Sequence, residues 1–562
     1  MEKVLNFKNK LSYFLNLIDK RQQEGDLWGV LDATRNAITY SKTKIEREGL
    51  DLLIGQVYYD MGQYSLSCEY FFRAVNIPHL RSACFFGLAR NLICVKKYDL
   101  ALDYLEGTLK WDFSNTWTGA VLEWTRVIKN NMDNPNFENE NLLKSAKNLI
   151  SQQEWAKAKE ILQTLKSDDE TQGCLALCYL LEEDYSTSER LIKEVLLNNP
   201  ENVMANCIMI EISQHRENEI LMTKHLQRLY LNETKNPEDI LRIAMLFSSR
   251  KEWVKALIFF ERLIKVDEFN SKNHLLCALC CHNLNKYEDA LYHISRARWL
   301  DIENPLYLFF FQLLKTHDLP DEVVIRNRLP KEIEKQKIES LLEIFYSGKF
   351  AQEINKSYYL LQDIEWSFSL YNTQLTQEAS SALCNCKHKN SVALIKKLLL
   401  SPRPNTHQKF VMAKNALLSN NFWTIDFVCN LRYSSFQISK NELTQIKNVQ
   451  IRNGICGAIS YVECFFPEEM KVTELSKHAY KEQNNPLLNN MSADTISCFL
   501  LYKYPHIFVS ACLFFDIQKE KIEQLYKTVS RTNEAESENS KSINESASEH
   551  HKTNEAEKND KQ

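Results

Sequence analysis

Apolar residues recur at helical spacing through the first 300 residues, in pairs of short amphipathic segments that are separated by a turn. The stretch LDLLIGQVYYDMGQYSLSCEYFFRAV shows one such pair. Ile54, Gly55 and Tyr58 share one helical face, Gly62 interrupts the pattern, and a second apolar face follows. The pattern predicts a helix, a tight turn and a second helix.

This pair repeats with a period of 34 residues. The small residue in the second helix recurs from Ser67 to Ala101 (101 − 67 = 34) and from Ala256 to Ala290 (290 − 256 = 34). Between Ser188 and Ala256 the spacing is two periods (256 − 188 = 68). A 34-residue helix pair with this alternation of small and large residues resembles the tetratricopeptide repeat.

Two glycines indicate how each pair is built. Gly55 lies where the two helices should cross, and a small side chain there lets the backbones approach. Gly62 lies in the turn, where a left-handed conformation costs least for glycine. Other units place Glu183 or Asn285 near that turn, so the turn tolerates other residues. We expect the pairs to stack into a superhelix with a concave surface, through contacts between neighbouring pairs.

The repeats predict a superhelix over residues 1–316, with seven or eight helix pairs. A further helix is expected over about 115–128, followed by a polar loop over 130–141. Residues 317–330 contain Pro320 and Pro330 and are predicted to form a hinge that is sensitive to proteases.

Helical periodicity continues beyond this segment without the 34-residue period, and one stretch alternates instead. Ile425, Phe427 and Cys429 alternate with polar or opposite-face residues, and Phe436 and Ile438 provide the matching positions of a second strand. The alternation predicts a small β-hairpin. The expected parts are HEAT-like helices (331–421), the β-hairpin (422–440), a C-terminal helical domain (441–530) and an acidic tail (531–562). The tail should be disordered, because its apolar content is too low to offset the entropy of ordering.

The order of these parts resembles a group of bacterial tetratricopeptide repeat proteins with a C-terminal HEAT-like helical region. The resemblance implies an all-α fold, in which a tetratricopeptide-type α-solenoid precedes a second helical domain with a small β-hairpin. It implies no established activity.

Charge and cysteine usage narrow the class of protein further. The net charge of −4 provides no global basic field, so nucleic acid is not favoured as a partner. Sixteen scattered cysteines suit free thiols in a reducing cytoplasm. No apolar stretch approaches the ~20 residues that span a bilayer, so no membrane segment is expected.

Two groups of possible metal ligands are better explained by packing. Cys277 and Cys281, near Cys280 and His282, occupy repeat positions where other units carry apolar residues. No second CxxC or HxxxH motif follows to complete four ligands. We therefore expect core packing here and no metal.

The second group, Cys384, Cys386 and His388, needs a loop or strand to converge, because residues two apart on a helix do not face each other. No phosphate loop, dinucleotide fingerprint, nucleophile elbow or HExxH motif occurs in the chain. We expect no cofactor and no enzymatic activity.

The leading hypothesis is a non-catalytic protein-interaction scaffold that binds a peptide or helix in the concave groove. Register places seven candidates on the first helices of the pairs: Gln56, Tyr59, Asn91, Lys147, Cys178, Met245 and Cys280. The alternative is a regulator that contacts nucleic acid through a helix-turn-helix-like segment at 492–527. Its Lys519, Lys521 and Lys527 are offset by Glu520 and Glu523.

Overall fold

The computed structural model describes residues 10–529 except 114, 134, 387, 420–423, 438–442, 444, 467–471, 483–484, 486 and 489–490. The acidic tail expected at 531–562 lies outside the described residues. The chain divides into two compact units, Met1–Lys337 and Ile338–Gln562. Both are helical, and a two-stranded sheet belongs to the second, so the all-α fold class is confirmed.

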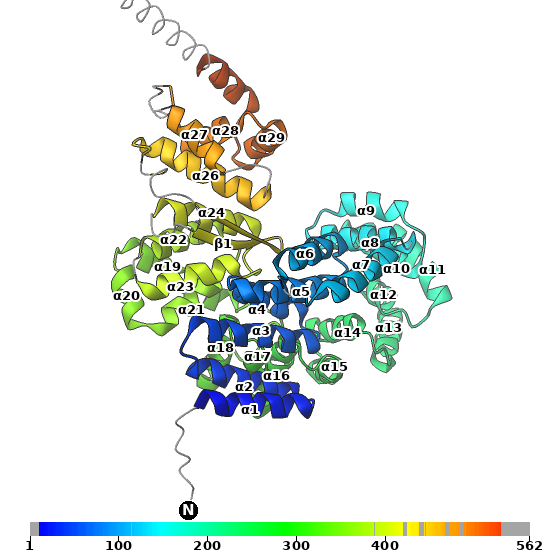
Figure 1. Ribbon diagram of the computed structural model, residues 1–562. Coiled ribbons are helices and arrows are strands. Elements are labelled where there is room, and N and C mark those ends of the chain that lie inside the picture. The colour runs from blue at the N-terminus through cyan, green and yellow to red at the C-terminus, as the bar shows by residue number, and fades with distance from the viewer. Residues whose placement is uncertain are drawn as a thin grey trace, which may run out of the picture. The chain divides into compact units, whose positions relative to one another are not determined.

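The first unit is a succession of antiparallel helix pairs. In Figure 1 it runs from α1 at the bottom upward and to the right, to α9–α11, and then returns through α14 and α15 to α16–α18. Eight pairs lie within its described residues, and α7 and α18 stand outside the pairing. The helices are α1 (Lys10–Gln23), α2 (Leu27–Tyr40), α3 (Lys44–Asp60), α4 (Tyr64–Ala74), α5 (Pro78–Cys94), α6 (Tyr98–Trp111), α7 (Thr118–Met132), α8 (Pro135–Ser151), α9 (Trp155–Thr164), α10 (Asp169–Leu181), α11 (Tyr185–Asn198), α12 (Val203–His215), α13 (Glu219–Leu231), α14 (Pro237–Ser249), α15 (Trp253–Val266), α16 (Ser271–Asn283), α17 (Tyr287–Leu300) and α18 (Pro305–Thr316).

The turn inside each pair depends on one residue in the left-handed conformation. Gly62 has φ 73°, as its position predicts, and its N–H donates to the carbonyl of Tyr59 at 2.9 Å. Left-handed residues also occupy this turn at Glu217, Lys251 and Asn285, spaced by 34 residues (251 − 217 = 34; 285 − 251 = 34). The geometry repeats while the side chain varies, because the cap is made by backbone hydrogen bonds.

The helices of a pair cross closely at the predicted small residues. A Cβ atom on Gly55 would lie 3.0 Å from the ring of Phe71, so the helices have no room for a larger side chain there. The hydroxyl of Ser67 donates to the carbonyl of Gly55 at 2.7 Å, and Ser188 makes the same bond to Ala176 at 2.8 Å. Small residues on both helices therefore set the crossing.

The polar loop predicted over 130–141 is wrong for most of its length, because α8 begins at Pro135. Proline is favoured in the first turn of a helix, where its missing N–H costs nothing. Phe137 packs on the ring of Tyr98 with centroids 4.9 Å apart, and the polar residues of this turn face solvent. Their polarity made the segment resemble a loop.

Contacts in the first unit are not confined to neighbouring pairs, contrary to expectation. Arg35 on α2 donates to the carbonyls of Trp299 and Leu300, and the hydroxyl of Tyr58 on α3 also donates to Leu300. Arg73 pairs with Glu303 at 3.2 Å. The first helices thus hold the C-terminal end of α17, and Figure 1 shows α2 and α3 beside α16–α18.

The segment predicted as a hinge is packed onto α16. Leu329 and Val323 are buried, and the side-chain amide of Asn283 exchanges two hydrogen bonds with the backbone of Val323, at 2.8 and 2.9 Å. Nε2 of His282 donates to the carbonyl of Pro320 at 2.7 Å. The segment covers the end of the superhelix, and the division between the units falls later, after Lys337.

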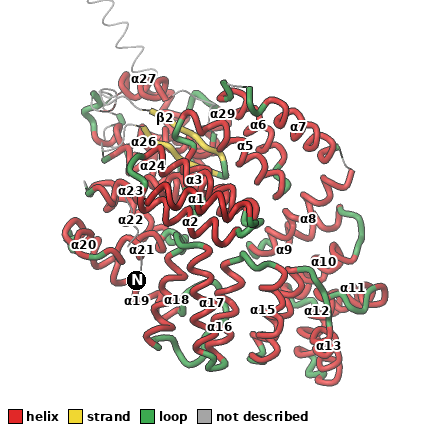
Figure 2. The backbone as a smooth tube through the Cα atoms, turned by 60° about the horizontal axis from the view of Figure 1, so that its bottom comes forward, coloured by secondary structure: helices red, strands yellow, loops and turns green. Residues whose placement is uncertain are grey.

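The second unit is a helical bundle with a hairpin, drawn as the yellow strands of Figure 2. Its elements are α19 (Lys331–Tyr346), which spans the division, α20 (Phe350–Lys356), α21 (Tyr358–Ser367), α22 (Thr373–Asn385), α23 (Lys389–Leu400), α24 (Thr406–Leu418), β1 (Thr424–Cys429), β2 (Arg432–Gln437), α26 (Val449–Phe465), α27 (Val472–Glu482), α28 (Ala493–Leu501) and α29 (Pro505–Phe514). A further helix covers 519–529.

The predicted hairpin is confirmed. The strands pair antiparallel, with Ile425 opposite Phe436. Asn430 and Leu431 form the two-residue turn with φ 51° and 65°, the positive values that suit the twist of a tight hairpin. Residue 438, which the alternation also places on the second strand, lies outside the described residues.

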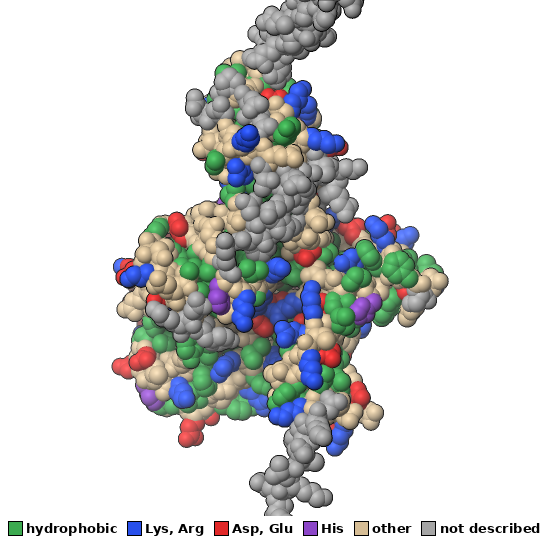
Figure 3. Space-filling view, turned by 60° about the vertical axis from the view of Figure 1, so that its left-hand side comes forward, with side chains coloured by type: hydrophobic (Ala, Val, Ile, Leu, Met, Phe, Trp, Pro, Cys, Tyr) green, Lys and Arg blue, Asp and Glu red, His purple; other side chains and the backbone are tan. Residues whose placement is uncertain are grey.

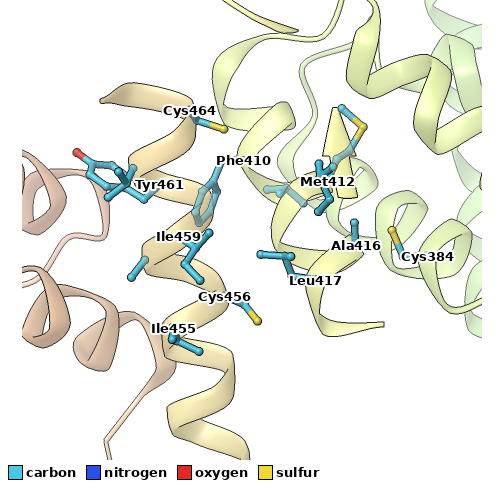
Figure 4. Packing of buried hydrophobic residues seen from close by; sticks show 14 of the residues in the cluster. Cys384, Phe410, Met412, Ala416, Leu417, Ile455, Cys456, Ile459, Tyr461 and Cys464 are labelled. Carbon is cyan, nitrogen blue, oxygen red and sulfur yellow. The ribbon is translucent and has the colours of Figure 1, made fainter. Parts of the chain in front are cut away.

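The core of the second unit centres on α24 and α26. Phe410 and Leu417 lie between these helices, near Ile459, while Ala416 faces Cys384 of α22 (Figure 4). Within this core Lys409 is 1% exposed, and its ammonium group donates to the carbonyls of residues 398, 399 and 401. These carbonyls end α23 and have no helical partner, so the buried charge acts as the cap of that helix.

Removing the hydroxyl of Tyr58 should weaken the contact between α3 and α17. Tyr58→Phe leaves the ring in place but removes a donor to Leu300 and an acceptor for Arg35, at a cost of about 1–3 kcal/mol in the free energy of unfolding. Urea denaturation measures this change. Tyr40→Phe is the matched control, because Tyr40 is 37% exposed and should change stability by less than about 0.5 kcal/mol. If the two variants lose equal stability, the hydrogen bonds of Tyr58 to the end of α17 do not stabilise the fold.

Adjacent valines test the packing of residues 317–330. Val323 is 4% exposed and Val324 is 74% exposed. Val323→Ala should lower the free energy of unfolding by about 1–3 kcal/mol, because it opens a cavity against α16. Val324→Ala should leave it nearly unchanged. If the two variants unfold at the same urea concentration, the segment is a free connector after all.

Lys409→Met should destabilise the second unit by about 2–4 kcal/mol, because three carbonyls at the end of α23 lose a charged donor while the volume of the side chain is kept. Lys414→Met on the same helix is the control. Lys414 pairs with Asp494 at 3.2 Å on a half-buried surface, where such a pair contributes about 0–1 kcal/mol. A variant of Lys409 as stable as the control would show that the cap is dispensable.

Candidate interaction groove

A cavity of about 940 Å³ opens on the first unit at the first helices of four successive pairs. Helices α8, α10, α12 and α14 each contribute side chains, and the end of α13 and the loops at 199–202 and 232–236 complete the wall. In a stacked array of helix pairs, the first helices of neighbouring units line one continuous surface. The cavity therefore follows directly from the repeat.

The floor of the groove is apolar. Ile150, Cys174, Leu177 and Met204 line it from three successive first helices. A Cβ atom on Gly173 would lie 3.1 Å from the sulfur of Met204, so α10 and α12 approach closely beneath the floor. Burial raises the pKa of the Cys174 thiol, which keeps it neutral and suited to an apolar surface.

The rim of the groove is acidic. Two cations line the cavity, and each is paired: Lys147 with Glu170 at 2.5 Å, and Arg242 with Asp239 at 3.1 Å. Burial raises the pKa of Asp239. The remaining charged lining residues are four carboxylates, Asp169, Glu201, Glu233 and Glu238, and no ion pair joins them to any described residue. The groove thus presents an excess of negative charge.

Helix geometry accounts for part of this charge. Asp169 and Glu170 begin α10, and Glu238 and Asp239 lie in the first turn of α14. Carboxylates are stabilised at these positions by the partial positive charge of the helix N-terminus. Because both of these first turns line the cavity, their carboxylates gather in the groove.

Of the seven residues that the register predicted for the groove, Lys147 lines this cavity. Gln56 and Tyr59 form a separate cluster with Arg90, one repeat later. The guanidinium of Arg90 lies 3.9 Å from the centroid of the Tyr59 ring and donates to Gln56 at 3.2 Å. Met245 is half-buried on α14.

Asn91, Cys178 and Cys280 are fully buried, so their side chains cannot line an open groove. Asn91 donates to Ser67 and to the carbonyl of Gly87, both at 2.9 Å. The thiol of Cys280 approaches the carbonyl of Trp253 at 3.4 Å. These positions face the second helix of their own or the preceding pair, so the predicted register is wrong for them.

Sequence reasoning missed most of the lining residues, including Met204 and Arg242. A usable signal was present, because the acidic first turns of α10 and α14 recur at the same point of their repeats. The loops that complete the wall carry no periodic pattern, and their contribution depends on how the pairs stack.

Four of the side chains that spacing suggested as metal ligands make other contacts: His282, Cys384, Cys386 and His388. Nδ1 of His388 accepts from the N–H of Asn390 at 3.3 Å and so caps α23, while Cys384 and Cys386 are buried in the core. His282 is engaged with Pro320. In the described residues, neither histidine joins a group of three ligand atoms.

The C-terminal segment at 492–527 folds as α28, α29 and the helix at 519–529. Residues 495–501 of α28 are buried, and Lys519 pairs with Glu523 at 3.5 Å. The face of the molecule in Figure 3 carries side chains of both charges. Among the described helices, none combines the length and the apolar character needed to cross a membrane.

Residues 218–297 match the family model described as "Anaphase-promoting complex, cyclosome, subunit 3". No curated protein matches the chain. One similar solved structure is YrrB, a TPR protein with an unusual peptide-binding site; the match is 15% identical, covers 44% of this chain and 100% of that chain, and has a TM-score of 0.21. Another is a TPR2AB-domain complex of yeast Sti1; the match is 11% identical, covers 55% of this chain and 98% of that chain, and has a TM-score of 0.20. MamA AMB-1 is also similar; the match is 15% identical, covers 30% of this chain and 93% of that chain, and has a TM-score of 0.21. These structural likenesses are too distant to carry a function.

The family match covers α13–α16 and most of α17, and the left-handed turns at Lys251 and Asn285 lie within it, 34 residues apart (285 − 251 = 34). The helix pairs, their small crossing residues and the period agree with the resemblance drawn from the sequence. The first unit is built of tetratricopeptide-type helix pairs, and a second helical unit follows it along the chain.

Proposed function

We propose that this protein is a non-catalytic interaction scaffold that binds a basic peptide segment in the groove of α8, α10, α12 and α14. The observation that carries the proposal is the groove itself, a cavity of about 940 Å³ with an apolar floor and an acidic rim. A cavity of this size can take up a few side chains of a partner, whereas a partner that docks through a flat surface would not fill it.

The two parts of the groove select different features of a partner. The floor of Ile150, Leu177 and Met204 favours apolar side chains, whose transfer from water supplies most of the binding free energy. The four carboxylates without ion pairs favour lysine or arginine at the flanks, which determine orientation and speed association. A basic amphipathic segment satisfies both.

A peptide array probed with the full-length chain tests this function. We expect enrichment of peptides with lysine or arginine beside apolar residues, and binding that weakens as salt is raised because exposed charge pairs are screened. Glu201→Lys combined with Glu238→Lys should weaken the best peptide by on the order of tenfold or more. Fluorescence anisotropy of the labelled peptide measures the change.

Charge reversal on the second helices is the matched control. Glu160 on α9 and Glu194 on α11 are exposed and lie outside the groove. Glu160→Lys with Glu194→Lys makes the same change in net charge and should leave affinity within about twofold at moderate salt. Selection of acidic peptides, or equal losses in the two double variants, would contradict the proposal.

The cluster at α3 extends the test along the solenoid. Gln56→Ala with Tyr59→Ala removes the groups that hold Arg90 without touching the α8–α14 cavity. Lost binding would add this end of the solenoid to the groove, and unchanged binding would confine the groove to α8–α14.

A further inference from the structure

Helices α16 and α17 bring together three side chains that are able to bind a metal ion. The ligand atoms of Cys277, Cys281 and His293 all lie within 4.8 Å of one another. Both thiols are buried, one helical turn apart on α16, and His293 reaches them from α17. The sequence pattern pointed to Cys280 and His282 beside the two cysteines, but neither belongs to this trio.

A chain of hydrogen bonds fixes which nitrogen of His293 is available. Nε2 of His274 lies 3.0 Å from the carbonyl of Glu268, which can only accept, so this nitrogen carries the proton. Nδ1 of His274 is therefore unprotonated. Nδ1 of His293 lies 3.2 Å away and must be the donor. The remaining nitrogen of His293, Nε2, has a free lone pair.

This is the arrangement that metal-binding histidines require. A ligating imidazole almost always donates its other N–H to an acceptor, which fixes the tautomer and the orientation of the ring. His274 provides that acceptor, and the backbone of Glu268 holds His274 in turn. The outer shell of a metal site is thus already built around His293.

The repeat supplies an internal comparison. Two periods earlier (293 − 225 = 68), His225 takes the place of His293, and its Nδ1 lies 2.7 Å from the amide oxygen of Asn206. Met209 and Ser213 stand there at the positions of the two thiols. A helix pair of this family therefore packs around an oriented histidine without cysteines, so packing alone does not require Cys277 and Cys281.

The chemistry of the trio favours Zn²⁺. Two thiolates neutralise the charge of the ion, so the buried site carries no net charge. Zn–S of about 2.3 Å and Zn–N of about 2.0–2.1 Å place tetrahedral ligand atoms roughly 3.5–3.8 Å apart. The three ligand atoms lie within 4.8 Å of one another, so they need to close by no more than about 1.3 Å. His293 is half-buried, which gives the ion a route to the trio.

We propose that Cys277, Cys281 and His293 bind one Zn²⁺ ion, with a water molecule as the fourth ligand and His274 as the positioning residue. Binding releases the two thiol protons to solvent and joins α16 to α17. The backbone of Glu268 holds His274, and the side chain of Glu268 accepts from the indole of Trp28 at 3.1 Å. The ion would therefore stabilise the region where the first helices meet the last.

Cobalt is the spectroscopic probe for this site. The full-length chain, freed of metal with a chelator and kept reduced with a phosphine, is titrated with Co²⁺. We expect one equivalent to produce the visible bands of tetrahedral Co²⁺ and a thiolate-to-metal charge-transfer band, and Zn²⁺ to abolish both. X-ray absorption of the Zn²⁺-loaded wild-type chain should show two sulfur ligands, which tests the site without any substitution.

Matched variants locate the ion. Cys277→Ser and His293→Asn should weaken Co²⁺ binding by more than the roughly 10–100-fold expected when an outer-shell partner is lost. Cys280→Ser, on the same helix, and His225→Asn, at the equivalent repeat position, should bind as wild type does. His274→Asn should weaken binding by about 10–100-fold but keep the same spectrum at saturation, because the ligands are unchanged.

Three results would overturn the proposal: no saturable thiolate band in the wild-type chain, a first shell without two sulfur atoms, or unchanged binding in Cys277→Ser. Circular dichroism of each variant shows whether its fold is kept. If Cys277→Ser does not fold, the absorption spectrum of the wild-type complex decides by itself.

Discussion

The fold of the first unit depends on the hydrogen bonds that the carbonyl groups at the C-terminal end of α17 accept from other helices. The last carbonyls of α17 have no partner within the helix. Arg35 donates to the carbonyls of Trp299 and Leu300, and Tyr58 donates to Leu300 from 242 positions earlier (300 − 58 = 242). A cation at a helix C-terminus is favoured by the dipole. This contact turns an open array of pairs into one whose two ends restrain each other.

That restraint bears on both proposed sites. A solenoid with free ends changes curvature at little cost, because each pair contacts only its neighbours. With its ends joined, the first helices that line the groove are held at a fixed curvature, so the apolar floor and acidic rim form a preorganised surface. The trio of Cys277, Cys281 and His293 lies beside the same junction, through Glu268 and Trp28.

In the second unit, a buried charge donates hydrogen bonds to the free carbonyl groups at a helix end. Lys409 caps α23 from inside the core, where an unpaired ammonium group would be costly, and its bonds to three carbonyls offset that cost. The hairpin shows the same reliance on backbone geometry, since Asn430 and Leu431 adopt the left-handed conformation required for a two-residue turn. In both units the fold is held where helices and strands end.

The sequence by itself determined the helix pairs, their 34-residue period, the close crossing at Gly55, the left-handed turn at Gly62 and the hairpin around Ile425 and Phe436. These features are local, and side-chain size and periodicity encode them directly. Tertiary structure alone decided that α2 and α3 meet α17, that residues 319–329 cover α16, that Asn91, Cys178 and Cys280 are buried, and that His293 joins two cysteines. Such contacts depend on curvature that accumulates over many repeats, and no single repeat contains that information.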